Sequence, residues 1–566
     1  MFKFLFFLFH IIAFVFNTVK VSSFRNNTEQ TEITIRTSLG FIRGTDLHTW
    51  KGSIFYGFRG IRYGKPPVNE LRFKDPVPIE SWNETFDATS DGPMCPQPDK
   101  NEMEYSEDCL RLNIYIRKLP NCEMTSINDE CSFTKKPVLF YIPGGGYYVG
   151  SGISSDYGGP YYLMEHDIIL VTINYRLGFF GYLNLGTKYY PGNAGFKDQV
   201  LALRFIRDHI EAFGGDPNRI TLIGNSAGAF SIALHLISPM SRGLFHQAIL
   251  GSGGLDVKSS LPSHQINAAR KQAKLFNCNT HDIDLMIQCF KSKTTKEYVD
   301  TVYDTFTFGK SLWGPVVEQN FNHERFLIEQ PHDSLIKGNF IKIPLIVGVT
   351  EDELVESAVG ILKSPISSFA LDHTWNIILP KLLGYEAFTH KSFNISKTLR
   401  QFYNIPTPIR ASNSIDQLSQ LISDGVIGFG SYRVLKFMEK FKPVYQYKFS
   451  YVGRYSHLYY PEDKAYGSEH SDDFIYILCR NRTAPIFNVN DPEAVIIEYI
   501  TKLYSNFVIY GDPNDETDPV INYINWTPLN DQSRNYLNMN ENLTIDNNLF
   551  KDRYDLWDEL FPIQYP

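Results

Sequence analysis

Apolar residues occur along this chain in short unbroken runs and do not alternate with polar ones. Ile, Val and Leu dominate the runs, and these residues favour strands. A strand that is apolar at every position is typical of a parallel sheet covered by helices, because both of its faces are then buried. The clearest strand candidates are residues 137–142, 167–173, 220–223, 247–250, 345–349 and 444–449.

Stretches with helical spacing lie between these strand candidates. Residues 199–213 repeat apolar positions at helical intervals and end at the glycines and proline of 214–217, which are typical of a helix stop. Another helix is expected to start at 491–493, where an Asp cap precedes a proline, and to run to about residue 508. Residues 355–440 are mostly helical, which predicts an insertion over the sheet.

The alternation of strands and helices predicts one α/β domain over residues 24–566, with a large, mostly parallel central sheet flanked by helices. Hydrophobic residues make up 43% of the 566 residues, so a sizeable core can be buried. The net charge is −8 and no cluster of Lys and Arg stands out, which argues against a nucleic-acid partner.

The apolar run 220–223 leads directly into Gly224-Asn225-Ser226-Ala227-Gly228, and a helical pattern follows at 229–236. A strand, a G-x-S-x-G turn and a helix in this order are typical of a nucleophile elbow. The sharp turn lifts the serine hydroxyl above the sheet, and only small neighbours tolerate the crowding. The alternative is a glycine-rich turn with an idle serine, but the flanking pattern favours Ser226 as a nucleophile.

A serine nucleophile needs a base within hydrogen-bond reach and an acid that orients the base. In this architecture the acid and then the histidine follow the serine along the chain. The strand candidate at 345–349 leads into Glu351, Asp352 and Glu353, and chemistry alone leaves all three carboxylates open as the acid. For any one of them, the simpler interpretation is a solvated acidic loop.

Two histidines follow the last buried strand candidate, residues 444–449. His470 lies in a loop flanked by a glycine and acidic residues, and His457 is the competitor nearer the strand. A loop histidine is usually just exposed. His470 is therefore favoured as the base only through its pairing with Ser226.

Three glycines, Gly144-Gly145-Gly146, follow the strand candidate at 137–142, where an oxyanion hole is expected. Glycines let the backbone come close to a substrate. We expect the N–H groups of Gly145, Gly146 and Ala227 to converge on a carbonyl oxygen. This chemistry needs neither a metal nor an organic cofactor, and the absence of a C-x-x-C motif makes a zinc site improbable.

The first 23 residues have the pattern of a secretory signal peptide. Lys3 gives a positive start, residues 4–16 are apolar, and residues 17–23 are polar and include small residues. A signal anchor is the alternative, but the run is shorter than the roughly 20 residues of a membrane span. No second run of spanning length and no lipid-anchor tail occur. We expect a soluble, secreted protein without a membrane anchor.

The cysteines agree with an oxidising compartment. There are seven, and the first six form three closely spaced pairs. Cys122 and Cys131, near the ends of a polar loop, are a candidate disulfide, whereas Cys479 has apolar neighbours that indicate a buried, inert thiol. Candidate glycosylation sites, each the Asn of an Asn-x-Ser/Thr sequon, are Asn26, Asn83, Asn394, Asn481, Asn525 and Asn542.

Together these features resemble the type-B carboxylesterase family, which includes the cholinesterases, over nearly all of the mature chain. Besides the elbow, the likeness is carried by residues 58–67, 106–110, 144–147, 174–178, 198–199 and 213–217. The resemblance implies the α/β-hydrolase fold, a small-molecule ester substrate and no cofactor. We expect a monomer or a homodimer.

Carried over position by position, the resemblance implies Ser226 as nucleophile, His470 as base and Glu353 as acid. It selects Glu353 because the family places the acid last in this run of carboxylates. It further implies two disulfides and two buried, structural ion pairs: Cys95–Cys109, Cys278–Cys289, Arg72–Glu107 and Arg176–Asp198.

The chain also resembles insect juvenile hormone esterases in its Arg72-Phe73, Asp198-Gln199, Glu353 and Gly467-x-x-His470-x-x-Asp473. It departs from them at Asn225, where those enzymes usually have Gln. A true acetylcholinesterase has an acidic residue at that position, and it stacks a quaternary ammonium on a Trp in the loop at 95–109, which is missing here. Choline esters are therefore not the expected substrates.

We predict a secreted serine carboxylic ester hydrolase, with a juvenile-hormone-type esterase as a narrower alternative. A non-catalytic adhesion or binding protein is another, since some relatives of this family keep the fold and lose the chemistry. The three retained triad residues argue against it. A triacylglycerol lipase would need a longer acyl groove.

Overall fold

The computed structural model describes residues 33–98, 103–120, 134–255, 258–306, 311–457, 466–480, 483–530 and 532–563. Some sequence-based predictions lie outside these described residues: the signal peptide at 1–23, the Cys122–Cys131 bridge, and the sequons at Asn26 and Asn481.

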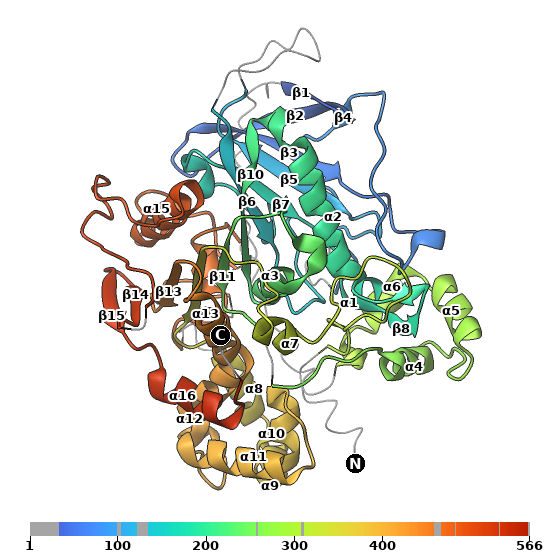
Figure 1. Ribbon diagram of the computed structural model, residues 1–566, viewed down its shortest axis with the longest axis vertical. Helices are drawn as coiled ribbons and strands as arrows, with labels where there is room; N and C mark the ends of the chain where they lie inside the picture. Colours follow the sequence, from blue (N-terminus) through green and yellow to red (C-terminus); the bar gives the residue numbers. More distant parts are fainter. Residues whose placement is uncertain are drawn as a thin grey trace.

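A 13-stranded sheet runs through the molecule, with helices on both of its faces (Figure 1). Its strands are β1 (Ile33–Thr37), β2 (Gly40–His48), β3 (Ile54–Arg62), β4 (Phe86–Asp87), β5 (Arg111–Ile116), β6 (Lys136–Ile142), β7 (Ile169–Ile173), β10 (Gly215–Asn225), β11 (Gln247–Gly251), β12 (Leu345–Thr350), β13 (Val444–Phe449), β14 (Asn535–Met539) and β15 (Thr544–Asn547). A separate small hairpin pairs β8 (Asn184–Thr187) with β9 (Tyr190–Pro191).

The strand order is β1-β2-β3-β5-β7-β6-β10-β11-β12-β13-β14-β15, with β4 beside β2. The strands from β7 to β14 in this order are parallel, and antiparallel strands extend the sheet at both edges. In β6, Leu139 and Tyr141 pack into the core on one face, while Val138 and Phe140 pack into the core on the other. The predicted mostly parallel sheet, buried on both faces, is confirmed.

The helices fill the connections between strands. They are α1 (Gly178–Tyr182), α2 (Ala194–His209), α3 (Ala227–Ile237), α4 (Ile266–Leu275), α5 (Ile283–Ser292), α6 (Thr295–Asp300), α7 (Pro331–Ile336), α8 (Val355–Lys363), α9 (Pro365–His373), α10 (Trp375–Leu383), α11 (His390–Phe402), α12 (Ala411–Ser423), α13 (Phe429–Met438), α14 (Asp472–Ile475), α15 (Ala494–Tyr510) and α16 (Lys551–Leu560). Within the described ranges, no helix is both long and apolar enough to span a membrane.

Two helix starts differ from the prediction. Helix α2 begins at Ala194, before the predicted residue 199, because its first turns bury Lys197 and Asp198 as ion pairs that an apolar pattern does not reveal. Helix α15 begins at Ala494, after the predicted 491–493. Glu493 is the N-cap residue of this helix; it is fully buried and its carboxylate pairs with Arg454 at 2.5 Å.

The predicted helical insertion is confirmed and has a core of its own. Helices α8 to α12 pack around Trp375, Leu379 and Leu418, and Trp557 of α16 closes this cluster. In Figure 1 the insertion lies below the sheet, in yellow and orange. A π-helical turn at Asp424–Gly428 joins α12 to α13.

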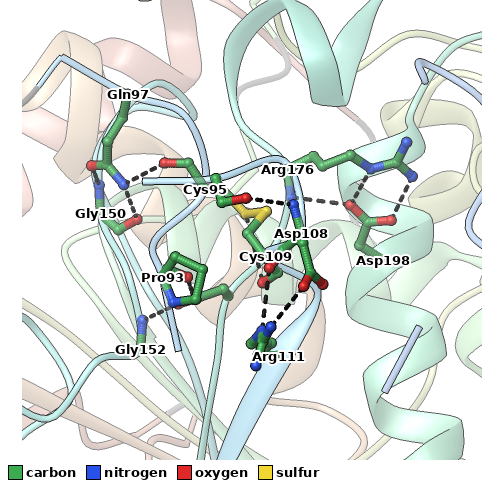
Figure 2. Close-up of a disulfide and its surroundings, with 12 residues drawn as sticks. Pro93, Cys95, Gln97, Asp108, Cys109, Arg111, Gly150, Gly152, Arg176 and Asp198 are labelled. Carbon is green, nitrogen blue, oxygen red and sulfur yellow. Dashed lines mark hydrogen bonds and ion pairs between the residues drawn. A yellow bond between two sulfur atoms is a disulfide. The ribbon is translucent and has the colours of Figure 1, made fainter. Parts of the chain in front are cut away.

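The disulfides Cys95–Cys109 and Cys278–Cys289 are both formed, and Cys479 is free and buried. Both implied ion pairs are present as well. The Arg72 Nε donates to Glu107 at 2.7 Å, and Arg176 contacts Asp198 close to the first disulfide (Figure 2).

Candidate active site

Ser226 stands at the tip of the turn between β10 and α3. Its backbone has φ 52° and ψ −126°, a conformation that residues other than glycine rarely adopt. A Cβ at Gly228 would lie 2.1 Å from the carbonyl oxygen of Ile142, so the sharp approach requires glycine there. The Ser226 N–H donates to the carbonyl of Gly251 at 2.9 Å. The turn therefore has the strained geometry that a nucleophile elbow predicts.

His470 contacts the loop that follows β12 through both its side chain and its backbone. Its Nδ1 lies 2.5 Å from Oε2 of Glu353, and its N–H donates to the carbonyl of Glu353 at 3.1 Å. Burial alone would lower the pKa of His470, but the Glu353 carboxylate outweighs it and the net pKa is raised. Because Nδ1 is held by the carboxylate, Nε2 is left as the basic nitrogen.

The three carboxylates of this loop have different partners. Glu351 pairs with Lys448 at 2.7 Å, and Asp352 accepts from the N–H of Ser468 at 3.3 Å. Glu353 is 2% exposed, and its second oxygen accepts from the N–H of Thr350 at 2.8 Å. Only the last of the three is oriented towards His470, as the resemblance implied.

His457, the competing base, has other partners. The backbone N–H of His457 donates to Asp472 at 2.6 Å, and its ring Nδ1 faces the Arg480 guanidinium at 3.4 Å. Burial and the Arg480 charge hold the pKa of His457 well below its usual value. Among the described residues, no carboxylate accepts a hydrogen bond from the ring of His457, in contrast to that of His470.

A cavity of about 630 Å³ brings the predicted site residues together: Ser226, His470, Gly145, Gly146 and Ala227 all line it. Gly145 and Gly146 have φ of 112° and 60°, and a Cβ at Gly145 would lie 2.1 Å from the carbonyl oxygen of Val149. The remaining wall is largely apolar and includes Phe230, Leu234, Leu255 and Trp313 together with Leu382, Ile422, Val426 and Ile427 from the helical insertion and the π-helical turn that follows it.

A hydrogen-bonded link that the sequence did not reveal joins the elbow to the histidine loop. Asn225 Nδ2 donates to Ser471 Oγ at 2.8 Å, and Asn225 Oδ1 accepts from the Tyr141 hydroxyl at 3.2 Å. Ser471 has φ 73°, so the chain turns sharply directly after His470. One amide side chain thus connects the neighbour of the serine with the neighbour of the histidine.

Buried carboxyl groups flank His470 in its own loop, and of these the sequence pattern singled out only Asp473. Burial raises the pKa of Asp472 to about 7, that of Asp473 to about 6 and that of Glu469 to about 10. Asp473 accepts from the Tyr447 hydroxyl at 2.7 Å, whereas neither oxygen of Glu469 has a hydrogen-bond partner among the described residues.

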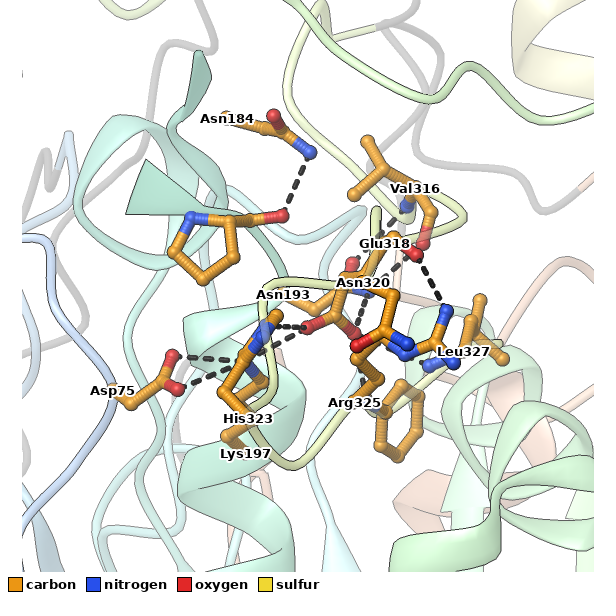
Figure 3. A network of polar contacts seen from close by, with 12 residues as sticks. Asp75, Asn184, Asn193, Lys197, Val316, Glu318, Asn320, His323, Arg325 and Leu327 are labelled. Atoms are coloured by element: carbon orange, nitrogen blue, oxygen red, sulfur yellow. Dashed lines mark hydrogen bonds and ion pairs between the residues drawn. The ribbon is translucent and has the colours of Figure 1, made fainter. Parts of the chain in front are cut away.

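A buried polar network supports one wall of the cavity. Lys197 of α2 pairs with Asp75 at 2.9 Å and with Glu318 at 2.8 Å (Figure 3). Asn193 donates to the carbonyl of Val316, close after the cavity-lining residues 313–315. The described ranges contain no group of three or more His, Cys, Asp or Glu side chains that could hold a metal ion.

Comparisons with known proteins agree with this geometry. The model of the carboxylesterase family matches residues 31–557. The chain is 34% identical to the juvenile hormone esterase of Tribolium castaneum over 88% of this chain and 86% of that protein. It is 33% identical to esterase FE4 of Myzus persicae over 87% and 86% of the two chains.

A solved structure is also similar. The juvenile hormone esterase of Manduca sexta, with OTFP covalently attached, superposes with a TM-score of 0.79 at 26% identity, covering 94% of this chain and 100% of that one. The sheet order and the flanking helices described above account for this match. The chain belongs to the carboxylesterase family and is an ester hydrolase with the α/β-hydrolase fold.

Proposed function

We propose that this protein is a secreted serine carboxylesterase that works through an acyl-enzyme. One observation carries the proposal: Ser226, on its strained turn, and His470, backed at 2.5 Å by the buried Glu353, line the same cavity. A nucleophile, a base and an acid that orients the base are the parts that serine ester hydrolysis needs.

In the proposed reaction, Ser226 Oγ attacks the ester carbonyl carbon while His470 Nε2 takes the hydroxyl proton. Glu353 accepts the Nδ1–H bond and stabilises the imidazolium that forms. The N–H groups of Gly145, Gly146 and Ala227 stabilise the oxyanion, a contribution of about 3 kcal/mol per donor in related sites. His470 then gives its proton to the leaving alcohol. Water then attacks the acyl-enzyme while His470 takes its proton, and the carboxylic acid product is released from Ser226.

The cavity walls support an ester with apolar groups as the substrate class. Phe230, Leu234 and Trp313 line it, together with apolar side chains from the helical insertion. A juvenile-hormone-type ester is a narrower candidate, favoured by the two similar proteins that are juvenile hormone esterases. Comparing kcat/KM for short-chain, long-chain and juvenile-hormone-like methyl esters separates a general esterase from a hormone-selective one.

Secretion is part of the proposal. Two disulfides are formed, which fits an oxidising compartment. The asparagines of the described sequons, Asn83, Asn394, Asn525 and Asn542, are all exposed and therefore accessible to glycosylation. The proposal also includes cleavage of residues 1–23 as a signal peptide and a disulfide between Cys122 and Cys131. Intact-mass and peptide mapping of the protein collected from culture medium tests each of these points.

Replacing the nucleophile tests the mechanism. The Ser226→Ala variant removes the attacking oxygen and nothing else, so turnover of p-nitrophenyl butyrate should fall by at least 10³-fold. Circular dichroism and thermal unfolding should match those of the wild type. If turnover is retained in a correctly folded variant, Ser226 has no place in the mechanism. If the wild type is itself inactive and unlabelled by a fluorophosphonate, the protein is a non-catalytic relative.

A further inference from the structure

One wall of the cavity that contains Ser226 includes a buried cation, Arg480. The side chain is 2% exposed, and it lines the cavity together with His457 and Tyr157. Its Nε and Nη2 atoms have no hydrogen-bond partner in the part of the chain that the structure describes. Buried guanidinium groups normally have an acidic partner, as Arg176 has in Asp198.

The described groups in contact with the Arg480 guanidinium are rings, and the Asp473 carboxyl group acts on it only electrostatically, without a hydrogen bond or ion pair to it. Its Cζ lies 4.9 Å from the centre of the Tyr157 ring and 5.7 Å from that of Phe474. Its Nη1 donates weakly to Nδ1 of His457 at 3.4 Å. Aromatic faces stabilise a cation only modestly, so Arg480 has hydrogen-bond donors that no acidic group among the described residues accepts.

The contact with Arg480 also sets the hydrogen positions of His457. Since Nδ1 receives a hydrogen from the guanidinium, the ring hydrogen of the neutral imidazole lies on Nε2. Burial and the Arg480 charge hold the pKa of His457 well below its usual value, which favours this neutral form. The imidazole therefore supplies an N–H donor beside the guanidinium, on the same wall of the cavity.

We propose that Arg480 and His457 form a substrate subsite for a carboxylate, so that the preferred esters carry a carboxylate in addition to the ester that is cleaved. This inference rests on the proposed function. A carboxylate accepts several hydrogen bonds at once and would neutralise the buried charge, which an apolar group cannot do. A cationic ester would be repelled. Glu356 also lines the cavity, and burial raises the pKa of its carboxyl group.

The test compares two matched pairs of esters, because the carboxylate can belong to the alcohol or to the acyl part. The first pair is 3-carboxyphenyl acetate and 3-methylphenyl acetate. The second is the mono-p-nitrophenyl ester of glutaric acid and p-nitrophenyl pentanoate. With the wild-type enzyme, the carboxylate ester of at least one pair should have a kcat/KM equal to or above that of its neutral partner. A tenfold preference for the neutral ester in both pairs would overturn the subsite without any variant.

The Arg480→Gln variant sharpens the comparison. For the favoured carboxylate ester, kcat/KM should fall at least tenfold through a rise in KM, while the neutral partner changes less than twofold. His457→Gln should act in the same direction with a smaller effect. Arg204→Gln, which removes a surface arginine paired with Glu324, is the matched control and should change neither ester.

The outcomes separate this inference from the proposed function. Equal losses for both members of a pair in Arg480→Gln would mean that the arginine is structural, and the subsite would be rejected while the esterase function stands. If Arg480→Gln does not fold, Arg480→Lys keeps a charge without the planar fork and should retain part of the preference. Absence of turnover with all four esters, together with an unlabelled Ser226, would reject the esterase function itself.

Discussion

Two buried ion pairs in this molecule, Arg176–Asp198 and His470–Glu353, use similar chemistry for different ends. Arg176 Nε and Nη2 donate to Asp198 at 2.8 and 2.6 Å (Figure 2). Arg176 Nη1 donates to the carbonyl of Lys74. Asp198 is completely buried. The Arg176 guanidinium thus donates its hydrogen bonds to groups of the protein core, and the pair connects the loop after β7 to helix α2.

In the second pair, His470–Glu353, the carboxylate contacts one of the two ring nitrogens of the histidine. The His470 ring contacts Glu353 through Nδ1 alone, and His470 and Ser226 line the same cavity. The Glu353 carboxylate is buried and held by a second bond from the N–H of Thr350, whereas Nε2 of His470 makes no hydrogen bond within the described residues. A buried pair that is fully satisfied stabilises the fold, whereas one with an unused nitrogen facing a cavity is available for proton transfer.

The largest effect on kcat is expected from a substitution in the His470–Glu353 pair. Glu353→Gln removes the charge that stabilises the imidazolium and should lower kcat by about 10⁴-fold, as for the corresponding change in other triads. Because the carboxylate raises the pKa of His470, the acidic limb of the pH–rate profile should also move to lower pH. Stopped-flow or steady-state rates between pH 5 and 9 measure both changes.

Glu351→Gln is the matched control for that variant. Glu351 lies two residues away, is 44% exposed and pairs with Lys448 outside the cavity. Its rate and pH profile should match those of the wild type. Similar losses in both variants would mean that the loop, not the carboxylate of Glu353, matters for the rate.

The next largest effect is expected from a substitution in the Arg176–Asp198 pair, and it should change the stability of the protein but not its catalytic rate. Asp198→Asn leaves the buried Arg176 charge without its partner and should lower the free energy of unfolding by about 3–5 kcal/mol. The kcat of the molecules that remain folded should be unchanged, because neither residue lines the cavity. Denaturant unfolding and active-site titration measure the two quantities separately. A lower kcat per titrated site would remove the distinction between the two pairs.

The smallest effect is expected at the Asn225–Ser471 link. A single neutral hydrogen bond contributes about 0.5–1.5 kcal/mol, so Asn225→Ala and Ser471→Ala should each lower kcat roughly 3- to 10-fold. Because they remove the same bond, the double variant should be no slower than the slower single variant. The single-variant effects should appear in kcat and leave KM nearly unchanged. Additive losses would show that the two side chains act independently.

The parts of this account that sequence could predict depend on local patterns. Ser226 stands out because a β-branched run, small neighbours and a helical run flank it, and each constrains the same turn. The parallel sheet follows from unbroken apolar runs such as 137–142. Helix starts were predicted less well where buried ion pairs place polar residues such as Lys197 inside the core.

Other parts depend on side-chain directions that no local pattern encodes. Glu351, Asp352 and Glu353 are chemically alike in the sequence, and only the path of the loop assigns each its partner. The Asn225–Ser471 contact joins residues that are 246 positions apart. Arg480 carries no motif, and the two nitrogens that lack a hydrogen-bond partner are visible only when the described residues around it are known.

Covalent labelling tests the central claim most directly. The wild-type protein would be treated with a fluorophosphonate, digested and sequenced by tandem mass spectrometry, with ester turnover measured in parallel. We predict a single phosphonylated residue, Ser226, and loss of turnover in proportion to labelling. Complete loss of turnover with the label on another residue, or full turnover with Ser226 quantitatively labelled, would contradict the account.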